Sequence, residues 1–375
     1  MPTLYDISKW NPQPWYSTGG TRSKKFVQNP EDSKFYYFKQ SFKSIGRDYF
    51  FEFWSEIIAT EIGQLLGFNV LRYDIAIDGD VMGCISESMI SDDETLTEGG
   101  QYLRAFDINF DPQVKDGRRL YSFQLIVNAL EEFQLSDQVN NIIELIIFDS
   151  IIGNGDRHQE NWAFINTQTF INKQMEVIQR DMKYGQHKNM PKFIQRILSR
   201  LFDDITKKDV KLKPEVKAVF LKLDKPKSFA PIFDNGSSLG RELETDKIDR
   251  MLGNEQELVA YINRGVSEIH WDLNTMELLE NIHADVPTDK NKVSHIDLIK
   301  RLLGSSYSEI TTEIIKRVLE KYDIKKIKNI IMSIDSPVVP GKCEKFKLPE
   351  NRKLLILKLI TLRIDRLKSL LDERL

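Results

Sequence analysis

Two short polar stretches of this 375-residue sequence contain most of the side chains that could do chemistry. The first reads GNGDRHQENW at 153–162, follows an apolar segment, and places Asp156 five residues before Asn161. The second reads APIFDNG at 230–236 and places Asp234 at the end of a short apolar run. A carboxylate can accept a proton from a reacting hydroxyl, while a second carboxylate and an amide oxygen are ligands that Mg²⁺ prefers. The two stretches together therefore favour phosphoryl transfer to a hydroxyl group.

Phosphoryl transfer also requires a cation that holds the phosphates of the nucleotide. Lys39 lies near the end of an aromatic run at 35–42, and an earlier small-residue loop at 17–21 contains Gly19 and Gly20. Taken singly, a strand lysine is usually solvated, and Asp or Asn in a loop usually forms a turn. The order of glycine loop, strand lysine, helix glutamate, D-x-x-x-x-N and D-x-G is, however, the order of the protein-kinase signature. The combination therefore favours a catalytic interpretation.

The elements that must position these residues divide the sequence into two parts. Residues 1–90 contain short strand-like runs, which we expect to begin near Trp15, and one long amphipathic helix that ends at Gly67. Residues 91–375 are mainly helical. Within them, residues 168–228 are charged and helix-rich and are predicted to form an insertion. We therefore expect an α+β fold with two lobes, a small antiparallel-sheet N-lobe and a mainly helical C-lobe.

Periodicity and turn residues predict the bounds of the individual elements. The predicted strands are 15–20, 24–27, 35–42, 69–77, 81–86, 162–165 and 229–234, and the main predicted helices are 48–66, 120–133, 141–152 and 350–375.

The stretches GDRHQENW and APIFDNGSSLG resemble the motifs of HipA-like bacterial kinases, in particular their compact CtkA-like branch. The resemblance extends from about Trp15 to Trp271 and implies a protein-kinase-like fold, shared with phosphatidylinositol kinases, that binds ATP and Mg²⁺ between its lobes. It implies that Asp156 is the catalytic base and that Asn161 and Asp234 are the metal ligands.

The resemblance also implies roles in the N-lobe, where Lys39 would hold the α- and β-phosphates. The loop STGGTRSKK departs from G-x-G-x-x-G and resembles the hydroxyl-rich phosphate loop of HipA relatives. Its hydroxyl residues between Ser17 and Ser23 are therefore expected either to be autophosphorylated or to cap turns. The remaining residues expected to bind the nucleotide are Gly19 and Gly20 in the loop, and Glu87, Met89 and Ile90 in the segment joining the lobes.

Some assignments stay open at the level of the sequence. Glu56 lies eleven residues before Gly67, as the family's helix glutamate does, whereas Glu61 falls within the apolar stripe of the same helix. We prefer Glu56 as the partner of the strand lysine. Arg157 could pair with a phosphate or be solvated, and His158 is expected to be a structural residue of the loop rather than a metal ligand or base.

Composition limits the other classes of function. The sequence has 53 basic and 56 acidic residues, and a net charge of −3 gives no general attraction to nucleic acid. Cys84 and Cys343 are its two cysteines, which excludes a disulfide framework and argues against a structural zinc site. The longest apolar stretch, 142–152, contains Glu144 and Asp149 and is too short to span a membrane. We expect a cytoplasmic protein, although a secreted effector would share these features.

The sequence thus predicts an ATP-dependent serine/threonine kinase that transfers the γ-phosphoryl group to a protein hydroxyl, with autophosphorylation as an open alternative. The resemblance further implies a toxin or effector role and an antitoxin-type partner. One alternative is a lipid or small-molecule kinase, since those families share D-x-H-x-x-N; another is a pseudokinase-like nucleotide-binding module, suggested by the irregular glycine loop. The insertion could recognise substrate, bind a partner or regulate access.

Overall fold

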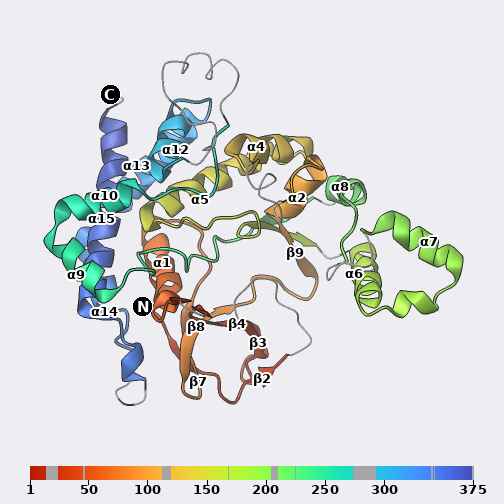
Figure 1. Ribbon diagram of the computed structural model, residues 1–375, viewed down its shortest axis with the longest axis horizontal. Coiled ribbons are helices and arrows are strands. Elements are labelled where there is room, and N and C mark those ends of the chain that lie inside the picture. The colour runs from red at the N-terminus through yellow and green to blue at the C-terminus, as the bar shows by residue number, and fades with distance from the viewer. Residues whose placement is uncertain are drawn as a thin grey trace.

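The computed structural model has two lobes, one built on a sheet and a larger one made mainly of helices (Figure 1). It describes residues 1–13, 24–44, 47–111, 120–167, 169–203, 210–223, 225–272, 293–338, 341 and 343–373. The expected two-lobed α+β architecture is confirmed. The predicted strand at 15–20, with Gly19 and Gly20, lies outside the described residues. Among the helices in the described ranges, none has the length and apolar character that crossing a bilayer requires.

The smaller lobe contains a six-stranded sheet with the strand order β1-β7-β8-β4-β3-β2. Neighbouring strands are antiparallel, except that β1 lies parallel to β7. The prediction that strands begin near Trp15 is wrong, because β1 and β2 precede it and are too short to show a period of two. The strands are β1 (Leu4–Asp6), β2 (Asn11–Pro12), β3 (Lys24–Gln28), β4 (Phe35–Gln40), β7 (Asp74–Asp78) and β8 (Val81–Glu87), with a separate ribbon of β5 (Lys43–Ser44) and β6 (Arg47–Asp48).

Alternation along β4 determines where Lys39 points. Phe38 packs with Ile85 in a cluster on one face of the sheet. Lys39 lies on the opposite face, because successive side chains of a strand point to opposite sides. Its partner in β8, Cys84, belongs to the large core cluster that also contains the apolar residues of α1. β4 therefore presents Lys39 toward α1 (Glu52–Leu66).

The helix α1 is buried along most of its length. Every residue from Glu52 to Gly63 is buried, because β8 contacts the helix and so do α13 and α14 of the larger lobe. Gly67 adopts a φ of 83° and closes the helix with a backbone hydrogen bond to Gln64 O at 3.2 Å. The predicted C-terminal glycine is thus confirmed. A helix buried on several sides can hold polar residues off its apolar stripe, provided that they find partners.

The larger lobe is organised around α5, an apolar helix that the core cluster surrounds. The long C-terminal helix α15 packs against α5, α9, α13 and α14. The helices of this lobe outside the insertion are α2 (Gly99–Phe106), α4 (Phe123–Glu132), α5 (Val139–Ile152), α9 (Thr245–Gly253), α10 (Glu255–Asn263), α12 (His295–Leu303), α13 (Ser308–Lys321), α14 (Ile324–Ser333) and α15 (Glu350–Asp372), with short 3₁₀ turns η1 (Ser136–Gln138) and η3 (Glu344–Phe346).

A second, three-stranded sheet carries the polar stretches. β10 (Ala163–Thr167) lies between β9 (Glu94–Glu98) and β11 (Ser228–Phe229). The predicted strand at 229–234 is wrong in length, since β11 ends at Phe229; Pro231 follows and has no N–H for a ladder. Ile232 instead forms one parallel bridge with Val70, and this bridge ties the segment before Asp234 to the smaller lobe.

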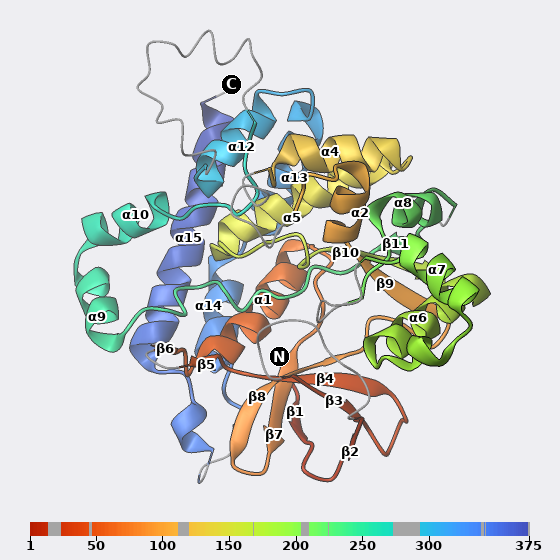
Figure 2. The ribbon, with the colours of Figure 1, turned by 45° about the vertical axis from the view of Figure 1, so that its right-hand side comes forward.

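The residues between β10 and β11 form a helical insertion. It contains α6 (Phe170–Lys183), η2 (Gln186–Asn189), α7 (Lys192–Leu201) and α8 (Pro214–Leu223). Met182, Leu198, Phe202 and Val210 form a small apolar cluster of its own. α8 packs against α2 of the larger lobe. Figures 1 and 2 place α6 and α7 at the edge of the molecule, on the side opposite α9 and α10.

Candidate active site

Three charged side chains from distant parts of the chain meet between the lobes. The ammonium of Lys39 forms ion pairs with the carboxylates of both Glu56 and Asp234. The side chains of Lys39 and Glu56 are 7% and 1% exposed, so water screens this contact poorly. The structure therefore brings the strand lysine, the helix glutamate and the acid of the second polar stretch into one cluster.

Glu61, the alternative partner of Lys39, lies elsewhere. Its carboxylate accepts a hydrogen bond from the amino group of Met1 at 2.9 Å and lies 3.7 Å from Arg72. The apolar stripe could not decide between Glu56 and Glu61, because α1 is buried around most of its circumference. The contact with Lys39 goes to Glu56, the alternative that we preferred.

The segment after β11 is held against α1 through its backbone. Glu56 Oε2 accepts a hydrogen bond from the backbone N–H of Asn235 at 2.7 Å. Asp234 adopts a φ of 56°, a left-handed conformation that Asp tolerates better than most residues. Glu56 therefore fixes both the lysine and the chain direction immediately after Asp234.

The first polar stretch forms a loop that starts where α5 ends. Gly153 adopts a φ of 68° and ends the helix. Asn161 Nδ2 donates to the backbone oxygen of Asp156 at 2.8 Å, so the two predicted site residues lie on the two sides of one turn. The hydroxyl of Ser237 donates to Asp156 Oδ2 at 2.9 Å. Sequence reasoning missed Ser237, although its position three residues after Asp234 was a signal.

Arg157 is buried rather than solvated, contrary to one of its two predicted alternatives. It is 1% exposed and donates to both carboxylate oxygens of Asp149, at 2.9 and 2.8 Å. It also donates to the backbone oxygens of Asn161, at 3.0 Å, and Phe233, and to Asn235 Oδ1 at 2.7 Å. Arg157 therefore connects α5, the first polar loop and the second one.

Burial raises the pKa of the Asp149 carboxyl above its ordinary value, and the Arg157 guanidinium opposes this effect. Burial lowers the pKa of Arg157, but attraction to Asp149 outweighs it and the net direction is upward. A planar guanidinium suits this bidentate contact. The sequence signal was Asp149 itself, an acid within an apolar helix eight residues before Arg157.

His158 has the role of a loop residue in the structure. Its Nδ1 accepts a hydrogen bond from the backbone N–H of Glu160 at 3.3 Å. That contact stabilises the turn between Asp156 and Asn161 and agrees with the structural role expected of this histidine.

An apolar cluster adjoins the charged residues on the side of the second sheet. Ala163, Ile165 and Ala230 are buried in it, and partly buried Met89 and Ile90 pack against them. The carboxylate of Glu87 lies 2.8 Å from the Lys34 ammonium, and both side chains are about half exposed. Nucleotide binding by Glu87 would therefore depend on its backbone.

The donor atoms suit a hard divalent cation. Because Asn161 Nδ2 donates to Asp156 O, the amide oxygen is directed away from that contact. With the Asp234 carboxylate, it provides the oxygen ligands that Mg²⁺ prefers. Among the described residues, no group of three or more His, Cys, Asp and Glu could hold a metal by itself. A metal here would therefore also need oxygens from outside these side chains, such as those of water or of a nucleotide.

No protein-family model and no curated protein matches the sequence, but solved structures do. The crystal structure of the Helicobacter pylori proinflammatory kinase CtkA matches with a TM-score of 0.66 and 17% identity, over 100% of this chain and 99% of that chain. HipA, from the Shewanella oneidensis MR-1 toxin–antitoxin complex of HipA, HipB and operator DNA, matches with a TM-score of 0.46 and 11% identity, over 98% of this chain and 68% of that chain. At this identity, the likeness to CtkA shows a shared fold.

Proposed function

We propose that this chain, which has the two-lobed fold of the kinase CtkA, is an ATP-dependent phosphotransferase of the HipA-like type. The observation that carries the proposal is the simultaneous contact of Lys39 with Glu56 and Asp234. A buried lysine that contacts two acids is held in place, as the grip on nucleotide phosphates requires. CtkA is itself a kinase, and its shared fold supports the same class of reaction here.

In the proposed reaction, each residue has one task. Lys39 holds the α- and β-phosphates, and Glu56 keeps its ammonium in position. Asn161 and Asp234 would hold Mg²⁺, which neutralises charge on the phosphates when it is bound. Asp156 accepts the proton of the acceptor hydroxyl. The oxygen of that hydroxyl bonds to the γ-phosphorus while the bond from the γ-phosphorus to ADP breaks and ADP leaves. The cluster of Met89, Ile90 and their neighbours offers an apolar surface to adenine.

We propose a serine or threonine hydroxyl of a protein as the acceptor. The hydrogen bond from Ser237 to Asp156 supports a hydroxyl acceptor, because it shows that a serine Oγ can reach this carboxylate. Gly19, Gly20 and the hydroxyl residues from Ser17 to Ser23 lie outside the described residues. Their roles in phosphate binding and autophosphorylation stay predictions, as does an antitoxin-type partner.

The test is a transfer assay with purified protein, Mg²⁺ and γ-labelled ATP, alone and with a cell lysate, followed by mass mapping. Asp156→Ala and Asp234→Ala should abolish labelling while the far-UV circular dichroism stays unchanged. Asp92→Ala, at an exposed turn, is the matched control and should label normally. Wild-type labelling in either site variant would refute the residue roles.

The products separate the remaining classes of function. Label on Ser or Thr of a protein supports the proposal. Label on a lipid or a small hydroxyl compound, with none on protein, would move the assignment to those kinases. ATP binding without turnover would indicate a pseudokinase-like module.

A further inference from the structure

A pocket of about 250 Å³ lies beside the loop at 153–162, which carries Asp156 and is the predicted catalytic loop, and the insertion forms one of its walls. Gln159 and Glu160, which precede Asn161, line it on the side of the loop. Arg104 comes from α2, and Lys211 and Lys217 come from the insertion. A chain segment that placed its hydroxyl at Asp156 could therefore extend into this pocket.

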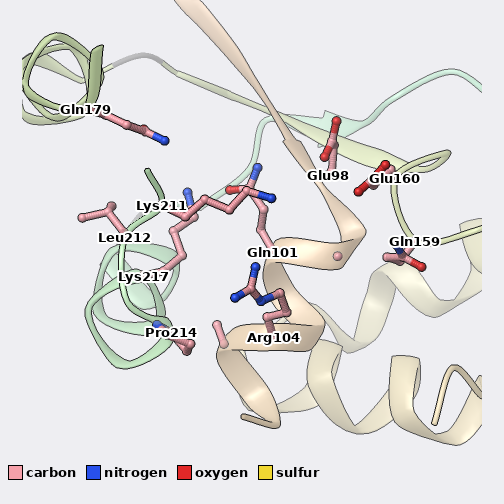
Figure 3. A pocket seen from close by; sticks show the side chains of 12 residues that line it. Glu98, Gln101, Arg104, Gln159, Glu160, Gln179, Lys211, Leu212, Pro214 and Lys217 are labelled. Carbon is pink, nitrogen blue, oxygen red and sulfur yellow. The ribbon is translucent and has the colours of Figure 1, made fainter. Parts of the chain in front are cut away.

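The positive and the negative side chains of the pocket lie on different walls. Figure 3 shows Arg104, Lys211 and Lys217 grouped on the side of α2 and the insertion, while Glu98 and Glu160 stand on the side of the catalytic loop. An anion would therefore be repelled at the catalytic loop and attracted at the far wall.

The pocket is joined to the catalytic loop by short backbone contacts. The backbone N–H of Gly100 donates to the backbone oxygen of Gln159 at 2.8 Å. The backbone N–H of Gly99 donates to the backbone oxygen of Trp162, also at 2.8 Å. A Cβ on Gly99 would lie 2.1 Å from the Trp162 ring, so glycine is needed for this approach. The start of α2 is therefore joined directly to the loop that carries Asp156.

We infer that this pocket binds an acidic or phosphorylated side chain of the protein segment that carries the acceptor hydroxyl. The inference rests on the proposed function and adds a specificity to it. Arg104, Lys211 and Lys217 supply the cationic wall, which Asp203, 3.8 Å from Arg104, and Glu98, near Lys211, partly balance. The two glutamates place the bound anion away from the reacting hydroxyl rather than beside it. The insertion then serves to recognise substrate.

The experiment uses full-length protein and serine-centred peptides that carry Glu, phosphothreonine, Ala or Lys at positions scanned away from the serine. Binding is measured by fluorescence anisotropy without ATP, and transfer is measured separately with γ-labelled ATP. The test variant is Lys211→Glu with Lys217→Glu. The matched control is Lys192→Glu, an exposed lysine of the same insertion that does not line the pocket.

Glu and phosphothreonine peptides should bind at least about tenfold more tightly than the Ala peptide at one fixed offset, and more weakly at high salt. The double variant should lose or invert this preference, and Lys192→Glu should keep it. Equal binding of all peptides, a preference for Lys, or the same loss in Lys192→Glu would each overturn the inference. Charge-selective binding without transfer would support the inferred pocket and refute the proposed reaction. Transfer without a charge preference would support the proposed reaction and refute the inferred pocket.

Discussion

Replacing Arg157 with lysine tests whether one buried side chain holds the two halves of the site together. Arg157 donates five hydrogen bonds, two of them to Asp149. A lysine ammonium can donate about three hydrogen bonds. Replacing the five of Arg157 therefore loses about two. Each hydrogen bond from a charged donor contributes about 1.5–3 kcal/mol. We therefore expect the free energy of unfolding to fall by about 3–6 kcal/mol.

The expected loss of activity has a separate cause. Arg157 binds the backbone oxygens of Asn161 and Phe233, and Phe233 immediately precedes Asp234. Releasing these carbonyls would let the two predicted metal ligands shift relative to each other. A displacement of about 1 Å at a reacting centre can reduce the rate by about a hundredfold.

The assay pairs equilibrium urea unfolding with turnover measured at a temperature where each variant is folded. Arg352→Lys is the control, because Arg352 is also buried and donates to backbone oxygens, those of Gly240 and Leu243, which follow Asp234 in sequence but do not adjoin Asn161 or Asp234. It should lose stability and keep its turnover. Asp149→Asn is a milder second variant that retains an acceptor for Arg157. An Arg157→Lys protein with wild-type stability and turnover would refute the reasoning, and lost stability with full turnover would reduce Arg157 to a structural role.

Three further predictions concern other parts of the molecule. Ser237→Ala should lower kcat about tenfold and leave the KM for ATP unchanged, because Asp156 loses an orienting hydrogen bond; an unchanged kcat would exclude that role. Glu56→Gln should lower kcat about a hundredfold, whereas Glu61→Gln should not, because Glu56 alone of the two contacts the strand lysine; equal effects in steady-state assays would contradict the assignment. Burial lowers the pKa of His295 to about 3. Between about pH 6.5 and pH 3 the unfolded chain therefore binds a proton at this histidine that the folded chain does not. As the pH falls through this range, the contribution of His295 should lower the free energy of unfolding by about 1.4 kcal/mol per pH unit. His295→Leu should remove this component in urea titrations at several pH values, and an identical slope would refute it.

Much of the architecture follows from local patterns. The apolar run of α5, the helical period and closing Gly67 of α1, and the strand-like runs of β3, β4 and β8 were predictable because each depends on neighbouring residues. The exceptions are instructive. β1 gains its pairing from β7, a strand distant in sequence, and β2 is only two residues long. β11 stops before Pro231, which has no N–H to donate.

The sequence by itself determined which chemical groups the chain carries and their order: Lys39, Glu56, Asp156, Asn161 and Asp234. Only the tertiary structure decided which of these groups touch. It paired Lys39 with the glutamate that lies off the apolar stripe, buried an arginine that the sequence left open to solvent, and set a basic wall of the insertion beside the catalytic loop. The physical reason is that periodicity reports the side of an element that is apolar, whereas a buried charge is placed by the partner that can satisfy it. That partner can lie far away in the sequence, as Asp234 does from Lys39.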